Sequence, residues 1–121
     1  MPLQNLIGPD PLAPVVSLAQ VRAALPPPPG QLSLAVLQHG SLLVKFYAPP
    51  GTDPQTPHDR DELYLVASGH ATAQVGAQRY AVASGDVIFV PAREPHRFED
   101  LSVDFAVWVM FYGPDGGEAG R

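Results

Sequence analysis

The stretch Gly85-Asp-Val-Ile-Phe-Val-Pro91-Ala-Arg-Glu-Pro-His96-Arg-Phe98 decides the fold of this chain. It leads from a glycine turn through a short apolar strand and a turn with two prolines to a histidine at the start of the next strand. The earlier stretch from Pro49 to Gly69 follows a similar order, in which glycine and proline turns lead to a histidine, a glutamate and an apolar strand. Two such units, with further short apolar runs between turns, predict an antiparallel β-sandwich or barrel.

Two histidines and one carboxylate of these units are candidate metal ligands. His58 and Glu62 belong to the earlier unit and His96 to the later one. Two imidazoles and a carboxylate can hold a divalent transition metal and leave coordination positions open. In one straight strand His58 and Glu62 would stand about 13 Å apart, too far to share an ion. We therefore predict a turn over residues 59–61, with His58 ending one strand and Glu62 beginning its antiparallel neighbour.

A helix over the same residues is the alternative geometry. Thr56 is a suitable N-cap and Pro57 a suitable first helical residue, and a helix would place the two ligands one turn apart. The apolar run that follows, residues 63–67, has no helical stripe and is closed by a serine and a glycine. Because a buried strand fits this run better, we favour the strand.

The bulk composition limits the classes of protein and partner. A chain of 121 residues has room for one domain with a single core. Its 12 acidic and 7 basic residues give a net charge of -5, which disfavours nucleic acid and anionic membranes as partners. The sequence contains no cysteine, so disulfides and thiolate metal sites are excluded. It shows neither a signal sequence nor an apolar run of membrane-spanning length, and we expect a cytoplasmic protein.

The start of the chain differs from the rest. Ser17 is a candidate N-cap of a short helix, which the proline run from Pro26 to Pro29 ends. The apolar stripe of this helix is Leu18, Val21, Ala24 and Leu25. We predict three segments: an N-terminal arm with this helix and a proline-rich linker over residues 1–31, a barrel over 32–112, and a flexible tail over 113–121.

Short strands fill the barrel segment. The predicted strands cover residues 32–38, 42–48, 63–67, 71–75, 79–83, 87–90 and 103–112. The last strand is apolar on both faces, with Phe105, Val107, Val109 and Phe111 on one and Ala106, Trp108, Met110 and Tyr112 on the other. A strand with one wet face would alternate, so either the arm or a second subunit must cover the second face. We predict a homodimer.

The two units resemble the two sequence motifs of the cupins. The match rests on His58-x3-Glu62-x6-Gly69 and Gly85-x5-Pro91-x4-His96, and the resemblance covers about residues 32–112. It implies an all-β, antiparallel jelly-roll barrel (a double-stranded β-helix), usually dimeric, that holds one metal, commonly iron, manganese, nickel, copper or zinc. The family includes dioxygenases, isomerases, epimerases, decarboxylases, sugar-binding regulators and storage proteins, so the resemblance defines a fold more sharply than a function.

Three side chains depart from the family pattern. Thr56 stands where the first motif ordinarily has another histidine, Arg93 where the second commonly has glycine, and Asp100 where asparagine is common. With one imidazole absent, the site is completed by a neutral oxygen of Gln55 or Thr56, completed by water, or without metal. Three protein ligands remain, which is a sufficient set.

Other residues of the two units are candidate ligand contacts. Arg60, Arg93 and Arg97 are predicted to bind an anionic substrate through paired hydrogen bonds, and the alternative is that they are surface residues. Tyr64 shares the parity of Glu62 and is predicted to face the cavity as a proton donor or a hydrogen-bond partner.

Other polar residues near the two units are not predicted to contact a metal or substrate directly. Asp59 and Asp61 are candidates to orient the imidazoles from behind, or are solvated turn residues. His39 and His70, in glycine-containing turns, are predicted to have no role as ligands. Lys45, on the strand face opposite the apolar side chains of its strand, is predicted to be exposed.

The leading functional hypothesis is a metal-dependent protein acting on a small organic acid or carbonyl compound. His58, Glu62 and His96 would hold a divalent metal (iron, manganese, nickel or zinc), and Glu62 and Tyr64 would take part in catalysis. The resemblance implies an oxygenase- or isomerase-like reaction. One alternative, motivated by Thr56, is a module that binds or senses a small ligand without turning it over. Another is a barrel whose polar mouth has no present role.

Overall fold

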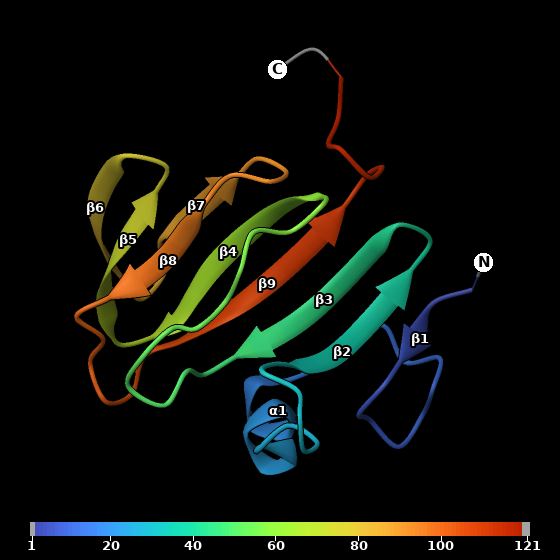
Figure 1. Ribbon diagram of the computed structural model, residues 1–121. Coiled ribbons are helices and arrows are strands. Elements are labelled where there is room, and N and C mark those ends of the chain that lie inside the picture. Colours follow the sequence, from blue (N-terminus) through green and yellow to red (C-terminus); the bar gives the residue numbers. More distant parts are fainter. Residues whose placement is uncertain (1, 120–121) are drawn as a thin grey trace.

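The computed structural model describes residues 2–119, in which two antiparallel sheets face each other (Figure 1). The larger sheet contains, in spatial order, β1 (Gln4–Asn5), β2 (Leu34–His39), β3 (Leu42–Tyr47), β9 (Ala106–Tyr112), β4 (Asp61–Ser68) and β7 (Val87–Val90). The smaller sheet contains β6 (Gln78–Ala83), β5 (His70–Val75) and β8 (His96–Glu99). The predicted all-β jelly-roll barrel is confirmed, although hydrogen-bonded strands do not close the two sheets into a ring.

The predicted strands form, with ends that differ by up to three residues. The largest difference is at β9, which begins at Ala106 because the preceding residues make a turn: the Phe105 amide donates to the Ser102 carbonyl at 3.1 Å. The strand interpretation of the first unit is confirmed by β4. The prediction that His58 ends a strand is wrong, because residues 48–60 form a loop.

Cross-strand pairing shows which side chains share a face. Lys45, Val109, Tyr64 and Ile88 form one row across β3, β9, β4 and β7. Since the last three belong to the buried cluster between the sheets, this face is the interior. Lys45 also points inward and is only partly exposed, so the prediction of an exposed lysine is wrong. The cause is that β3 is covered on both sides, with Phe46 buried on the other.

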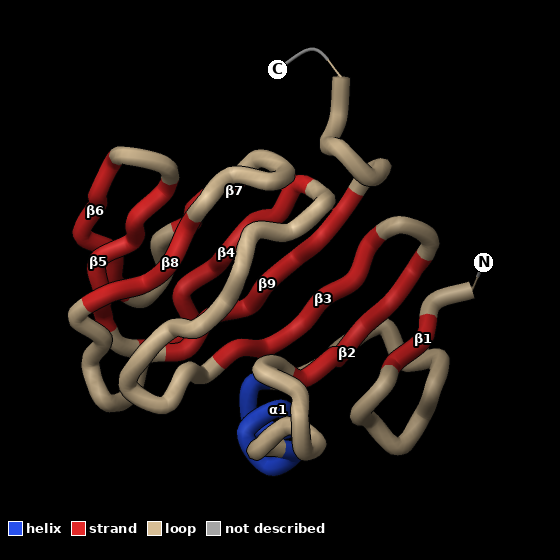
Figure 2. Tube along the Cα trace, in the orientation of Figure 1, coloured by secondary structure: helices blue, strands red, loops and turns tan. Residues whose placement is uncertain are grey.

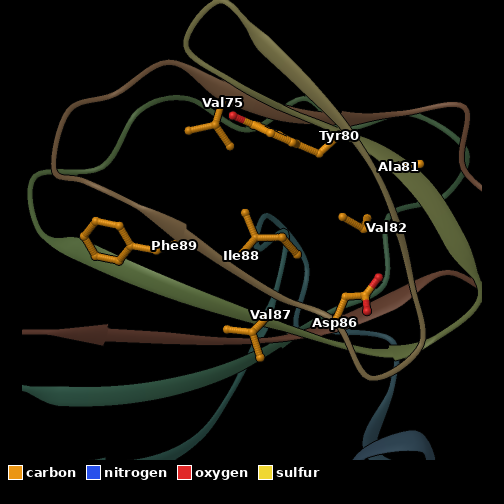
Figure 3. Close-up of a pocket in the computed structure, with 8 residues that line it drawn as sticks. All are labelled: Val75, Tyr80, Ala81, Val82, Asp86, Val87, Ile88 and Phe89. Carbon is orange, nitrogen blue, oxygen red and sulfur yellow. The ribbon is translucent and has the colours of Figure 1, made fainter.

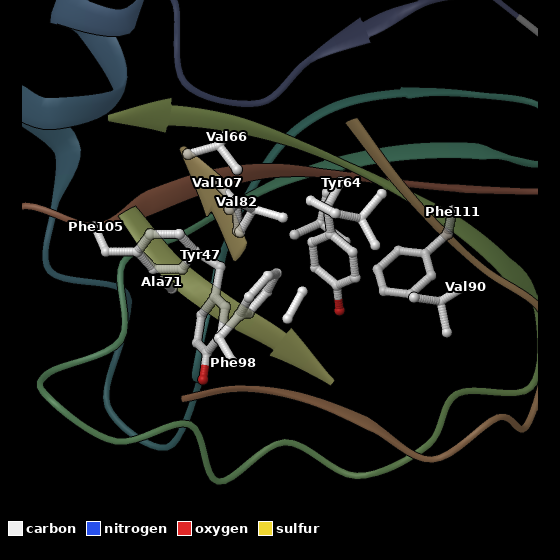
Figure 4. Close-up of a cluster of buried hydrophobic side chains, with 13 residues drawn as sticks. Tyr47, Tyr64, Val66, Ala71, Val82, Val90, Phe98, Phe105, Val107 and Phe111 are labelled. Atoms are coloured by element: carbon white, nitrogen blue, oxygen red, sulfur yellow. The ribbon is translucent and has the colours of Figure 1, made fainter. Parts of the chain in front are cut away.

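Aromatic side chains organise the interior (Figure 4). The Phe98 ring lies 5.1 Å from the Tyr64 ring and 4.9 Å from the Phe105 ring, centroid to centroid. Edge-to-face and tilted contacts of this kind add to the free energy of burial. They also fix the ring of Tyr64, whose hydroxyl reaches the polar end of the barrel.

The N-terminal arm covers one end of the outer face of the larger sheet (Figure 1). Helix α1 (Leu18–Ala24) begins with the predicted cap: Ser17 Oγ accepts from the Gln20 amide at 3.0 Å, and Gln20 Oε1 accepts from the Ser17 amide at 2.9 Å. Val21 is fully buried, whereas Ala24 is exposed, so the predicted stripe is wrong at Ala24. Within residues 2–119, no helix has the length and hydropathy needed to cross a membrane.

The N-terminal arm covers part of the second apolar face of the last strand, β9. Val21 packs in one cluster with Phe46 and Ala106, and Trp108 lies against that cluster. The arm alternative is therefore confirmed for the first half of β9. Further along the same face, Val87 and Phe89 of the edge strand β7 remain 60% and 48% exposed.

Gly69 ends the first motif at a point where no side chain fits. Its φ is +75°, which favours glycine, and a Cβ at this position would lie 2.8 Å from the Cα of Phe105. This close approach joins the end of β4 to the turn before β9, the two strands with the most extensive mutual pairing in the larger sheet.

The sheets meet along two sides that we name the closed seam and the open seam. At the closed seam, where β8 faces β3, the loop of residues 48–60 runs between the sheets (Figure 2). At the open seam, between β6 and β7, a hollow of about 490 Å³ is lined mainly by apolar side chains, including Tyr80, Val82, Ile88 and Phe89 (Figure 3).

The predicted C-terminal tail reaches Arg121, and its last two residues lie outside the described residues. As far as Glu118, backbone amides of the tail donate hydrogen bonds to the barrel and to the loop before β4. The Gly116 amide donates to the Asp59 carbonyl at 2.6 Å, and the Glu118 amide donates to Asp61 Oδ2 at 2.8 Å. The tail thus contacts the turn between the two ligands of the first motif.

Candidate metal centre

His58, Glu62 and His96 converge inside the barrel at the closed seam. Glu62 lies on β4, His96 is the first residue of β8, and His58 comes from the loop between β3 and β4. One ligand atom from each residue lies within 4.8 Å of those of the other two. Glu62 Oε1 lies 3.2 Å from His58 Nδ1 and 2.8 Å from His96 Nε2. The structure therefore brings together the three residues that the sequence singled out.

The three side chains differ in exposure. The side chains of Glu62 and His96 are 1% and 2% exposed, whereas that of His58 is 34% exposed. Two donors are sealed in the interior and the third faces the solvent side. Any molecule that approaches the cluster from solvent meets His58 first.

The second motif positions His96 through its backbone. His96 Nδ1 lies 2.8 Å from the Glu94 carbonyl oxygen, to which it donates its proton. Because Nδ1 carries that proton, Nε2 is the nitrogen that is directed at Glu62 and available to a metal. The preceding turn is held at two points: the Ala92 amide donates to Asp61 Oδ1 at 2.9 Å, and the Arg93 amide donates to the His58 carbonyl at 2.6 Å.

Among residues 2–119, two residues other than glycine adopt the left-handed conformation. Arg93 has φ 65° and Asp100 has φ 52°. These are the two positions of the second motif where the family commonly has glycine and asparagine, the residues that tolerate this conformation best. The departures noted in the sequence therefore mark backbone positions that are strained here. The strain at Arg93 lies in the turn that ties the second motif to His58.

A hydrogen-bond network surrounds the cluster on its buried side. The Tyr64 hydroxyl donates to Gln55 Oε1 at 3.0 Å, and its oxygen lies 3.0 Å from His96 Nε2. Gln55 Nε2 donates to Asp53 Oδ2 at 2.8 Å. Asp53 also accepts from the Tyr47 hydroxyl at 2.6 Å and from the Phe98 amide at 2.7 Å. One carboxylate of the loop thus joins β3 to β8.

The electrostatics of the cluster favour an ion pair. Burial alone raises the pKa of Glu62, but hydrogen bonds from His58 and His96 outweigh it and hold that pKa below its ordinary value. Burial alone lowers the pKa of His96, but hydrogen bonds to Glu62 and the Glu94 carbonyl outweigh it and raise that pKa. In the metal-free protein the glutamate is ionised beside a histidine that is stabilised in its protonated form.

Tyr64 remains protonated in this environment. Burial first, and then the charge of Glu62, raise the pKa of Tyr64 far above its ordinary value. The phenol is therefore a hydrogen-bond donor and not a base. Its donation to Gln55 orders the loop next to the cluster.

The donor set fits a cation. Glu62 Oε2 is buried and has no hydrogen-bond partner within the described residues. A buried carboxylate oxygen without a partner is costly, and a bound cation removes that cost. Two imidazoles and a carboxylate are donors that suit a divalent transition metal. The residues present are therefore compatible with one such ion held by His58, Glu62 and His96.

The two predicted neutral ligands differ in their placement. Thr56 is exposed, whereas the Gln55 side chain is bonded to Tyr64 beside the cluster. Of the two predicted neutral ligands, Gln55 is therefore the one whose side-chain oxygen lies next to the site.

The predicted arginines are not gathered at one point. Arg60 is partly buried, donates to the Ser41 carbonyl, and lies with its guanidinium 5.9 Å from the Phe111 ring centroid. Arg93 and Arg97 are exposed and lie 3.6 Å from Asp59 and 3.2 Å from Glu99, respectively. Of the three, Arg60 is the one that lines a hollow beside His58.

Two hollows adjoin His58. The inner one, about 50 Å³, is lined by residues that include Lys45, Tyr47 and Gln55, and the outer one, about 280 Å³, by residues that include Lys45 and Arg60. The larger hollow of the open seam has Asp86 as its charged lining residue and no histidine. The candidate site lies at the smaller hollows, because the metal-ligating side chains are found there. Sequence reasoning missed Lys45 and Asp53 because their direction depends on tertiary pairing.

This fold and donor set define a small jelly-roll barrel with a histidine and carboxylate centre. The chain belongs to the cupins, because the family model for the cupin domain matches residues 44–112. An uncharacterized protein of Streptomyces coelicolor is 40% identical over 84 residues, which cover 68% of this chain and 80% of that protein.

Solved structures show the same fold. The crystal structure of a cupin-2 domain-containing protein from Shewanella frigidimarina is 13% identical, covers 82% of this chain and 95% of its own, and superposes with a TM-score of 0.66. A structure from a study of DMSP lyases is 29% identical with a TM-score of 0.55. That match covers 65% of this chain and 42% of the other, so this chain spans less than half of that protein.

Proposed function

We propose that this cupin binds one divalent transition metal through His58, Glu62 and His96 and acts on a small organic acid or carbonyl compound. The observation that carries the proposal is the convergence of three donors on a carboxylate whose second oxygen is buried without a partner. Iron, manganese, nickel and zinc all suit such donors.

The chain's own residues prepare the site. A bound metal would act as a Lewis acid toward an oxygen of the substrate. Glu62 and His96 lie in a sealed interior that excludes water from one side, and the Glu94 carbonyl fixes which nitrogen of His96 faces the centre. Tyr64, protonated and bonded to Gln55, holds its hydroxyl against His96 as a positioning residue.

We propose an oxygenase- or isomerase-like reaction as the class of chemistry. Two histidines and one carboxylate leave coordination positions for a substrate oxygen and a second ligand, as both reaction types require. The likeness to a structure from a study of DMSP lyases supports a small organic substrate.

Metal analysis of protein purified without a polyhistidine tag tests the proposal. We expect close to one equivalent of metal after reconstitution, and at least about a 100-fold weaker affinity in Glu62→Gln. His70→Gln, at an exposed histidine outside the cluster, is the matched control and should bind as the wild type does. Less than about a tenth of an equivalent after reconstitution with each candidate metal would end the proposal.

Binding without turnover is the second candidate function. The exposed Thr56 in place of an imidazole favours it, because a centre with fewer protein ligands holds its ion less firmly. Glu62→Gln separates the two functions. Loss of both metal and turnover supports catalysis, whereas a wild type that binds ligand and shows no turnover to lose supports a binding module.

We also propose a homodimer that forms through the uncovered part of the larger sheet. Met110, Leu63 and Phe89 form one row across β9, β4 and β7 on the outer face, and none of them is charged. Val44, the next residue of the row on β3, packs against the cluster that the arm covers. The arm covers only the neighbouring end of this face. A second copy is the expected occupant because an apolar, self-complementary face suits a two-fold axis.

Light scattering of the wild type and Phe89→Lys tests the dimer. The wild type should have twice the mass of the chain, and Phe89→Lys should dissociate to the monomer while it retains its metal. Tyr80→Lys, which places the same charge across the open seam on β6, should leave the mass unchanged. A wild type that is monomeric at every concentration would refute the dimer. A cytoplasmic location, and the lack of nucleic-acid and membrane partners, remain predictions from composition.

A further inference from the structure

Lys45 occupies an unusual place for a lysine. It stands in the inward-facing row of the larger sheet, paired with Val109 of β9 and Ala35 of β2. Its Nζ lies 5.9 Å from the centroid of the Phe111 ring. His58 packs against the same ring, with a centroid distance of 4.9 Å. The ammonium group and the solvent-facing ligand of the candidate metal centre therefore share one aromatic wall.

Both hollows beside His58 meet at Lys45. His58, Lys45 and Phe111 line the inner hollow of about 50 Å³ and also the outer hollow of about 280 Å³. Lys45 is the one permanently charged side chain that lines the inner hollow, where Tyr47 and Gln55 add neutral polar groups. The inner hollow therefore places an ammonium group and two neutral polar side chains next to a metal ligand, with Val109 and Phe111 as apolar walls.

Lys45 has no carboxylate partner in the described part of the chain. None of the ion pairs within residues 2–119 involves it, although Asp59 and Asp115 line the outer hollow. A contact with an aromatic face stabilises a partly exposed ammonium by only about 0.5–1 kcal/mol. A partly buried cation that lines a hollow and has no paired carboxylate is a feature that an anionic ligand would complete.

We propose that Lys45 anchors the ligand of this site and that the ligand is a short monocarboxylate. A single ammonium matches one negative charge, whereas dianions such as phosphate esters are usually held by several donors or by a bidentate arginine. The inner hollow has room for a group about the size of a carboxylate or two waters. The outer hollow, with Leu43 and Phe111 in its wall, would receive a short carbon chain.

This inference deepens the proposed function and rests on it for the ligand's second contact, with the metal. The contact with Lys45 does not depend on the metal, so the two ideas can fail separately. Arg60 lines the outer hollow but is engaged with the Ser41 carbonyl. We therefore assign the main charge contact to Lys45 and not to Arg60.

Calorimetric binding of pyruvate, with its neutral analogue pyruvamide as the control ligand, tests the assignment. Pyruvate should bind the metal-loaded wild type at least about tenfold more tightly than pyruvamide. In Lys45→Gln, pyruvate affinity should fall about tenfold or more, pyruvamide affinity should stay the same, and metal affinity should be unchanged. Arg79→Gln, at an exposed arginine of β6, is the matched control and should bind pyruvate as the wild type does. Lys45→Met, which keeps the aliphatic stem against Phe111, replaces Lys45→Gln if that variant does not fold.

The outcomes distinguish the two ideas. Three results would each overturn the anchor and leave the metal centre standing. The first is that Lys45→Gln binds pyruvate with the affinity of the wild type. The others are that the wild type binds pyruvate and pyruvamide equally well, or that metal-loaded protein does not bind pyruvate. A wild type that takes up no metal but binds pyruvate in a Lys45-dependent way would overturn the proposed function and support the anchor.

Discussion

At the closed seam one carboxylate joins the two sheets, whereas at the open seam an apolar hollow separates them. Asp53 accepts hydrogen bonds from Tyr47 on β3, from Gln55 in its own loop, and from the Phe98 amide on β8. Asp86, at the open seam, accepts from the Ala83 amide within its own turn at 2.8 Å. The first contact spans the barrel and the second is local.

The difference explains where the chemistry is located. Polar groups that cross a seam fix side chains from distant parts of the sequence, and a metal centre requires that kind of precision. The loop of residues 48–60, which carries Asp53, also carries His58, so the same segment closes the seam and supplies a ligand. The open seam has volume, but Asp86 is the one charged residue among the described residues that line it and no histidine is among them, and volume alone does not make a catalytic site.

The largest expected effect comes from removing the carboxylate of the closed seam. Asp53→Ala leaves four hydrogen bonds without their acceptor and should lower the free energy of unfolding by about 3 kcal/mol. Asp86→Ala, the matched change at the open seam, should cost less than about 1 kcal/mol, since it removes one local bond. Urea denaturation of both variants measures the contrast. Equal losses would show that the two seams contribute alike.

The next effect is the pH dependence of the metal-free protein. Glu62, with a lowered pKa, stabilises the fold above its unfolded pKa near 4.5, and this contribution is lost as pH falls through its folded pKa. His96, with a raised pKa, stabilises the fold fully below 6.5, and this contribution is lost as pH rises through its folded pKa. The stability that Glu62→Gln removes should therefore be largest between about pH 4.5 and 6.5.

Urea denaturation with a chelator present, from acid to alkaline pH, measures this window. Asp86→Asn at the open seam is the control, and it should lose stability above pH 6.5 in the same way as the wild type. A wild type and Glu62→Gln whose stabilities differ by the same amount at every pH would contradict the ion pair.

A smaller effect is expected from single hydroxyl groups on the two seams. Tyr64→Phe removes the donor to Gln55 and should cost about 1 kcal/mol and about a tenfold loss of metal affinity. Tyr80→Phe, whose ring is exposed at the open seam, should change both quantities very little. Thermal unfolding and metal titration give the two readouts. A Tyr64→Phe variant with full metal affinity would remove Tyr64 from the support of the centre.

The smallest effect is a gain in stability at the closed seam. Arg93→Gly relieves a left-handed arginine and should raise the free energy of unfolding by about 0.5–1 kcal/mol. Arg93→Ala keeps the strained backbone and should not show this gain, because the exposed ion pair with Asp59 contributes little. Chemical denaturation of the pair decides between backbone and side-chain effects. A gain in Arg93→Ala equal to that in Arg93→Gly would place the cost in the side chain.

Local patterns in the sequence were sufficient for the strands and for the three candidate ligands. Short apolar runs between glycine and proline turns predict β4 to β7 closely, because such runs have few other stable conformations. His58, Glu62 and His96 were found through the matching order of two units. Their convergence follows from the fold, since β4 and β8 approach each other at the polar end of the barrel.

Other features depend on contacts that no local pattern encodes. The alternation of side chains correctly places Lys45 on the face of β3 opposite Phe46. Because both faces of β3 are covered, the alternation does not show which face is the interior. Asp53 lies in a loop rich in proline, and nothing in its neighbours indicates that it reaches the Phe98 amide 45 residues later in the chain. The strain at Arg93 became visible only when its φ was known, although its departure from the family's glycine marked the position.

Asp61 carries a practical consequence for protein engineering. One of its oxygens receives the Ala92 amide from the turn before His96, and the other receives the Glu118 amide from the C-terminal tail. A truncation that begins after Gly113, of the kind made to improve crystals, would remove the second donor from a buried acid. Shortening the protein at that end would therefore disturb the segment that aims an imidazole in the barrel, and fusion partners are better attached at the other terminus.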